Sequence, residues 1–185
     1  MSAKPRRVEI DASTAECLVF TQKEGLLSKI AHDLKIRVTK FTLAWDGDTL
    51  SARFDPRSLR VVDAMVKGRE SPGALGAGDK KKIEKSIVSD VLHPRKHRSI
   101  EFRSSEVAPE GDGYRVKGEL DLHGVTRSIS AKVKLSGGHW SAQVTIDQPA
   151  YGIEPFSAML GTLKVKPKVR VRISLPDGAL PLLAS

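Results

Sequence analysis

The chain has 185 residues, of which 39% are hydrophobic and 29% are charged, and its formal net charge is +9. This length fits one domain, and it allows a core large enough to fold without a disulfide or a structural metal. The single cysteine, Cys17, excludes an intrachain disulfide, and no stretch approaches the ~18 apolar residues that a membrane-spanning helix requires.

The N-terminal residues are basic but contain no apolar run of the kind found in signal peptides. We therefore expect a cytoplasmic protein. Cys17 is interpreted as a small strand residue, because no histidine stands near it in the sequence to make it a nucleophile.

Apolar and polar residues alternate along most of the chain, which is the period-two pattern of strands with one buried face. Turn sequences separate these runs, for example Gly137-Gly138, which predicts a tight hairpin. The connections are short, so neighbouring strands should be antiparallel. The predicted strands are residues 8–12, 17–20, 34–39, 41–45, 50–54, 99–103, 114–122, 128–135, 140–146 and 163–175.

One segment breaks the alternation. Residues 69–79 are rich in Gly, Ala and Ser and predict a mobile loop, with Gly73, Gly76 and Gly78 allowing large backbone changes. Residues 80–92 have helical spacing, with Asp79 as the expected N-cap and His93-Pro94 ending the helix. We expect this loop and helix to form a lid over one end of the sheet.

A sheet with one apolar face either packs on a second sheet or closes on itself, and the alternation alone leaves both open. A resemblance decides between them. The stretches at 30–38 (IAHDLKIRV), 91–104 (VLHPRKHRSIEFRS) and 116–127 (VKGELDLHGVTR) resemble the YceI-like family in order and spacing, over roughly residues 8–175. The third stretch is the most specific.

The resemblance implies an all-β fold: a single extended antiparallel lipocalin-like β-barrel of about eight strands with one short crossing helix. The barrel would be one domain, residues 1–185, with its core at about 8–175. Members of this family bind polyisoprenoids or other long-chain amphiphiles without catalysis. The expected function is therefore non-catalytic binding of an isoprenoid or fatty-acyl ligand in the lumen, for carriage or sequestration, with no cofactor.

The expected ligand-binding residues face the lumen by strand parity. Apolar chains bury against such side chains at about 25 cal/mol per Å². The alternative is a fully packed barrel without a cavity. The lumen candidates are Phe54, Phe102, Leu120, Leu122, Trp140, Val144, Val169 and Val171.

Polar candidates stand where strands begin or end. His32 and Asp33 open a strand and His123 closes one, so all three are expected at the barrel rim, where they could bind a ligand head group. A small hydrolase is a competing interpretation, but it needs a Ser or Cys nucleophile beside a histidine, and the sequence has no Gly-x-Ser-x-Gly motif. His93 and His97 have helical metal-ligand spacing, but Pro94 between them argues against a metal site.

A basic stripe follows the last predicted strand: Lys164, Lys166, Lys168, Arg170 and Arg172 share one face. The simplest interpretation is the solvated outer wall of the barrel. The alternative function is an interaction module in which this wall binds an anionic membrane or a protein partner. The stripe has no interleaved aromatic residue for base stacking, which argues against nucleic acid. A homodimer is left open, since barrels of this kind pair.

Overall fold

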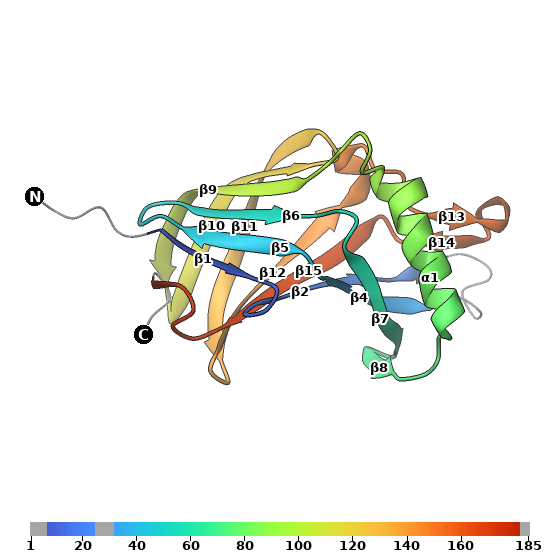
Figure 1. Cartoon of the computed structure of the whole chain (residues 1–185), viewed down its shortest axis with the longest axis horizontal. Coiled ribbons are helices and arrows are strands. Elements are labelled where there is room, and N and C mark those ends of the chain that lie inside the picture. The colour runs from blue at the N-terminus through green and yellow to red at the C-terminus, as the bar shows by residue number, and fades with distance from the viewer. Residues whose placement is uncertain (1–6, 25–31, 182–185) are drawn as a thin grey trace, which may run out of the picture.

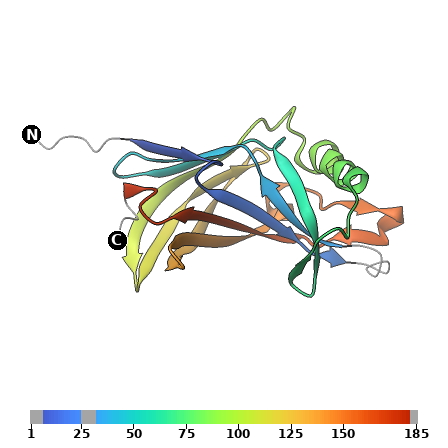
Figure 2. The ribbon, with the colours of Figure 1, turned by 60° about the horizontal axis from the view of Figure 1, so that its bottom comes forward.

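The computed structural model of the chain describes residues 7–24 and 32–181, and it shows an elongated, strongly curled antiparallel sheet with one helix against its side (Figures 1 and 2). Twelve strands form the main sheet, and three short strands form a second one. The expected all-β barrel with one helix is confirmed. None of the helices in the described part combines the length and apolar composition that crossing a bilayer would need.

Three of the barrel strands are long strands interrupted by a bend. Their halves are β1 (Val8–Asp11) and β2 (Glu16–Thr21), β4 (Asp33–Val38) and β5 (Phe41–Trp45), and β6 (Leu50–Phe54) and β7 (Leu59–Val66). The first bent strand pairs with the second through β1 with β5 and β2 with β4. The second pairs with the third through β5 with β6 and β4 with β7.

Five uninterrupted strands complete the barrel: β9 (Ile100–Glu110), β10 (Gly113–Leu122), β11 (Val125–Ser136), β12 (His139–Asp147) and β15 (Lys168–Pro176). The pairings of β6 with β9 and of β15 with β2 close the ring. Three bent strands and five straight ones make eight, and the described chain has more separate segments than this because of the bends and the short additional strands.

The helix begins earlier than the sequence predicted. Helix α1 spans Ala77–Ser86 with Gly76 at its N-cap, so the predicted cap, Asp79, lies within the first turn instead. A π-helical segment, η1 (Ile87–Leu92), continues it and ends at His93, as expected from the following proline. The predicted loop at 69–79 is shorter than expected, because β8 (Arg69–Ser71) pairs with β7 to extend the sheet.

The predicted last strand at 163–175 is two strands in two different sheets. β14 (Leu163–Val165) pairs with β13 (Ser157–Ala158) and with β3 (Lys23–Glu24), whereas β15 starts at Lys168. The break falls at Pro167, which has no N–H to donate to a ladder. Two short 3₁₀ segments, η2 (Gln148–Tyr151) and η3 (Met159–Gly161), lie in the connection from β12 to β14.

Candidate functional site

The barrel encloses a cavity of about 620 Å³, a size within the range of about 300–1,000 Å³ typical of small-molecule sites. Its wall is mainly apolar side chains from the inward parity of the barrel strands, as the alternation predicts. The interior is therefore not the fully packed core that was the alternative expectation.

Seven of the eight predicted lumen residues line this cavity, and Trp140 does not. The Trp140 indole is buried, its Nε1 donates to Asp177 Oδ1 at 2.8 Å, and its ring meets that of Tyr114 edge-on with centroids 5.5 Å apart. Trp140 is thus part of the packed end of the barrel. The seven lining residues are Phe54, Phe102, Leu120, Leu122, Val144, Val169 and Val171.

Several wall residues were not among the candidates although their strand parity places them there. Cys17, Leu34 and Ile36 are buried residues of β2 and β4 that line the cavity. The burial of Cys17 raises the pKa of its thiol to about 12, which keeps it protonated and unreactive, in agreement with a structural role.

The helical segments supply one side of the cavity wall. Ile83 and Ile87, one turn apart, and then Val91 and Leu92 line the cavity from α1 and η1. The sequence predicted the helical spacing of these apolar residues, and it is this spacing that turns them together toward the lumen.

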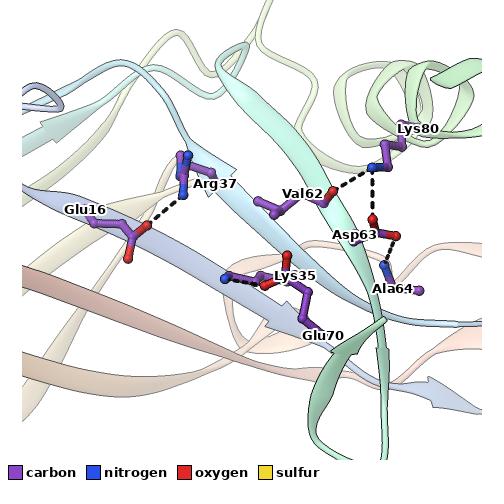
Figure 3. Close-up of polar contacts among 8 residues, drawn as sticks. All are labelled: Glu16, Lys35, Arg37, Val62, Asp63, Ala64, Glu70 and Lys80. Carbon is purple, nitrogen blue, oxygen red and sulfur yellow. Dashed lines mark hydrogen bonds and ion pairs between the residues drawn. The ribbon is translucent and has the colours of Figure 1, made fainter. Parts of the chain in front are cut away.

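Polar contacts hold α1 against the part of β7 that does not pair with β8. Glu84 Oε1 accepts a hydrogen bond from the backbone N–H of Val61 at 2.8 Å. Lys80 Nζ donates to Val62 O at 2.7 Å and to Asp63 Oδ2 at 3.2 Å (Figure 3). We call the Lys80 and Asp63 contact the helix latch.

Two ion pairs on the outer face of β4, from Lys35 to Glu70 and from Arg37 to Glu16, are drawn in the same view.

The hydrogen bonds of Asp63 explain its charge state. Its carboxylate accepts from the N–H groups of Gly73 and Ala64 as well as from Lys80. These bonds, with that from Gly73 the largest contribution, lower the pKa of Asp63 below its ordinary value. The carboxylate of the latch is therefore ionised at neutral pH.

The three predicted rim residues fall in different places. His32 precedes β4 and lines the cavity. Asp33 does not line it: its Oδ1 accepts the backbone N–H of Lys23 at 2.7 Å and so fixes β3 beside β4. His123 is also outside the cavity, because it occupies the two-residue turn from β10 to β11 with a positive φ of 56°.

His123 belongs to a cluster of three histidines. Its ring centroid lies 4.0 Å from that of His97 and 5.7 Å from that of His93. Burial, followed by the electrostatic effect of His97 and His93, lowers the pKa of His123. In the described part of the chain its Nε2 has no hydrogen-bond partner, and no group of three His, Cys, Asp or Glu side chains is arranged to hold a metal.

The basic stripe is interrupted at Pro167 but continues along β15 on the outer wall. Arg170 and Arg172 lie over the ring of Phe20 on the adjacent strand, with guanidinium carbons 5.7 and 5.4 Å from its centroid. The stripe itself has no aromatic residue, as the sequence indicates, and Phe20 reaches this face from β2, which is distant in sequence and adjacent in the barrel.

Solved structures with this fold come from several bacteria. BcnA of Burkholderia cenocepacia aligns with a TM-score of 0.64 at 16% identity, over 90% of this chain and 98% of its own. A polyisoprenoid binding domain from Saccharophagus degradans, implicated in plant cell wall breakdown, aligns with a TM-score of 0.59 at 15% identity, over 93% and 97% of the two chains. These likenesses show the fold.

Sequence relatives are matched over a shorter stretch. UPF0312 proteins of Serratia proteamaculans and Pectobacterium atrosepticum are each 39% identical over 49 residues, which is 26% of this chain and 26% of each relative. The match to the YceI-like domain covers residues 7–176, from the first described barrel strand to the end of the last one. The chain therefore belongs to the YceI-like family.

Proposed function

We propose that the protein binds one long-chain apolar or amphiphilic molecule, of isoprenoid or fatty-acyl type, in the lumen of its barrel, and that it carries or sequesters this molecule without altering it. The observation that supports the proposal most strongly is the cavity of about 620 Å³ with its apolar wall. The polyisoprenoid binding described for the Saccharophagus degradans domain, which shares the fold, agrees with it.

The wall favours a chain over a compact ligand. Strand residues line the cavity from Leu175, near the packed end, to Val169 and Val165 at the other end, so it follows the long axis of the barrel. Hydrocarbon buried along such a wall contributes about 25 cal/mol per Å² of apolar surface removed from water. Carriage or sequestration requires this burial and no reactive group.

A lumen-filling substitution tests the proposal. Ala142 on β12 lines the cavity, and Ala142→Trp should fill space that a ligand would occupy. We expect the variant to fold and to lose binding of geranylgeraniol, measured by displacement of the neutral fluorescent probe N-phenyl-1-naphthylamine. Ala108→Trp is the matched control, since Ala108 is half-buried on β9 outside the cavity lining. Equal binding by wild type and Ala142→Trp would contradict a lumen site.

A second candidate, docking to an anionic membrane, is favoured by one surface observation. Leu160 in η3 is fully exposed with a positive φ of 56°, and basic residues of β14 and β15 follow it in the chain. An exposed leucine beside lysines can insert into a bilayer interface while each lysine attracts the anionic surface by about 1 kcal/mol.

Co-sedimentation with phosphatidylglycerol vesicles tests this candidate. We expect Leu160→Asp, and separately Lys166→Glu with Arg170→Glu, to abolish association without unfolding the barrel. Lys81→Glu with Lys85→Glu makes the same change in net charge on the exposed side of α1 and should leave association intact. Unchanged sedimentation of the first two variants would exclude membrane docking through this surface.

A further inference from the structure

Several polar residues of the cavity wall lie at one end of the barrel. Thr21 at the end of β2, Lys23 in β3 and Lys82 in α1 all line the cavity. β3 pairs with β14, and Figures 1 and 2 both place α1 and the β13–β14 hairpin at the same end of the barrel. The Lys82 side chain is 84% exposed, so the cavity reaches the surface here. We call this end the mouth.

The mouth is positively charged. Three lysines, Lys23, Lys82 and Lys164, and His32 contribute to the lining, and no aspartate or glutamate among the described residues does. A positive group beside an apolar cavity raises the local concentration of anionic ligands.

Acidic residues also lie near the mouth, and their contacts partly offset its positive charge. Asp33 accepts the backbone N–H of Lys23, and Glu24 is the residue opposite Lys164 in the β14–β3 ladder. Asp79 lies 4.0 Å from Lys82, at the limit of an ion pair, and both side chains are well exposed. An exposed pair of this length is weak, so a ligand anion can replace it.

A buried hydroxyl at the same place has no partner. Thr21 Oγ1 is shielded from solvent and makes no hydrogen bond within the described part of the chain, although Thr21 lines the cavity. A buried polar group without a partner costs free energy. A ligand oxygen that accepts a hydrogen bond from this hydroxyl, two residues from Lys23, would remove that cost.

We propose that the bound molecule is a single-chain amphiphile with an anionic head group, a carboxylate or a phosphate, and that Thr21, Lys23 and Lys82 bind this head at the mouth while the chain fills the lumen. This inference rests on the proposed lumen site and specifies the chemical class of its ligand. Thr21 Oγ1 donates a hydrogen bond to a head-group oxygen, and the two ammonium groups neutralise the charge.

Matched ligand pairs test the inference. Palmitate is compared with palmitamide, and geranylgeranyl phosphate with geranylgeraniol, by displacement of N-phenyl-1-naphthylamine at low and high salt. Hydrogen bonds to charged groups are strong enough that we expect each anion to bind roughly tenfold or more tightly than its neutral partner at low salt. High salt should reduce this advantage. The two pairs show whether the carboxylate or the phosphate is preferred.

Substitutions at the mouth test whether its residues cause the tighter binding of anionic ligands. Lys23→Gln with Lys82→Gln should weaken binding of the anions and leave the neutral ligands unchanged, whereas the control Lys81→Gln with Lys85→Gln should change neither. Thr21→Val should weaken anion binding without lowering the melting temperature of the empty protein, because it removes an unpartnered hydroxyl. Should the lysine variant fail to fold, Thr21→Val and the salt dependence of the wild type still test the inference.

The outcomes separate the two proposals. Equal affinity for charged and neutral partners, independent of salt, would overturn the anionic head group and leave the lumen site intact. No binding of any of the four ligands would overturn the proposed function itself.

Discussion

Lys80 Nζ lies 3.2 Å from Asp63 Oδ2, and this contact joins helix α1 to strand β7 across the side of the cavity. Asp63 is only 5% exposed and accepts two backbone hydrogen bonds as well, so its carboxylate is fixed before the helix meets it. Because Ile83 and Ile87 of the same helix line the cavity, the position of α1 and the shape of the lumen depend on one another.

Removing the lysine should loosen the helix. Lys80→Met keeps much of the side-chain volume but leaves Asp63 without its ammonium partner and Val62 O without its donor. We predict faster hydrogen–deuterium exchange in residues 77–92 than in the wild type and faster release of a bound chain. Lys81→Met, on the same helix but exposed, is the control. Exchange in Lys80→Met as slow as in the wild type would show that the apolar contacts and the hydrogen bond from Val61 N–H to Glu84 hold the helix without the lysine.

Gly118 permits a close approach of two strands. A Cβ at this position would lie 2.3 Å from Arg103 O and 2.7 Å from Phe102 Cζ, next to the bulge in the β9–β10 ladder. Gly118→Ala should therefore reduce the free energy of unfolding by about 1–3 kcal/mol, the usual cost of overpacking. Urea denaturation measures this value.

The opposite sign is expected at a glycine with open space around it. Gly78 lies in α1, and a Cβ there would meet nothing within 4 Å. Gly78→Ala should stabilise the protein by about 0.5–1 kcal/mol through its helix preference. If both alanine substitutions were equally destabilising, the strand packing at Gly118 would not be the cause.

His123 predicts a dependence of stability on pH. Its pKa is lowered in the folded protein from the reference value of 6.5, mainly by burial and then by His97, His93 and Lys96. As the pH falls, His123 therefore binds a proton in the unfolded chain before it does so in the folded protein. Its contribution to the free energy of unfolding is complete above pH 6.5 and declines below that pH.

An asparagine substitution tests this dependence. His123→Asn removes the titration and suits the positive φ of the turn. We expect its melting temperature to change less than that of the wild type between pH 7.5 and 5.5, and His139→Asn, at an exposed position of β12, to behave like the wild type. Parallel profiles for all three proteins would show that His123 does not control acid sensitivity.

Cys17 reports on access to the lumen. The residue is 1% exposed, and burial, reinforced by the charge of Glu16, raises the pKa of its thiol to about 12. At pH 8 its thiolate fraction is roughly a thousandfold lower than that of a free cysteine with a pKa of about 8.5. We predict very slow reaction with Ellman's reagent, slower still when a chain occupies the cavity that Cys17 lines. A rate equal to that of a free cysteine would mean that the barrel opens readily at this point.

The regular part of the fold was predictable because alternation is a local property. Residues 34–38 and 114–122 point their apolar side chains inward as the pattern indicated, and seven lumen residues follow from parity alone. The bends that divide three strands were not predictable, since each depends on which neighbour the next residues pair with. Pro167 was the one local indication that the strand at 163–175 would break.

The parts of the site that were missed depend on contacts distant in sequence. Trp140 has inward parity but is held in the packed end of the barrel by Asp177, and His123 meets His93 and His97 from another segment instead of facing the lumen. The sequence does not show that the Thr21 hydroxyl has no hydrogen-bond partner among the described residues, because this depends on how the residues around it are buried.

The most direct test of the central claim, that the lumen holds one long apolar chain, is native mass spectrometry of the gently purified protein, followed by solvent extraction and mass identification of the extract. We expect a one-to-one adduct that extracts as an isoprenoid or fatty-acyl species and is absent from Ala142→Trp. A bare chain mass, both as purified and after incubation with geranylgeraniol or palmitate, would contradict it.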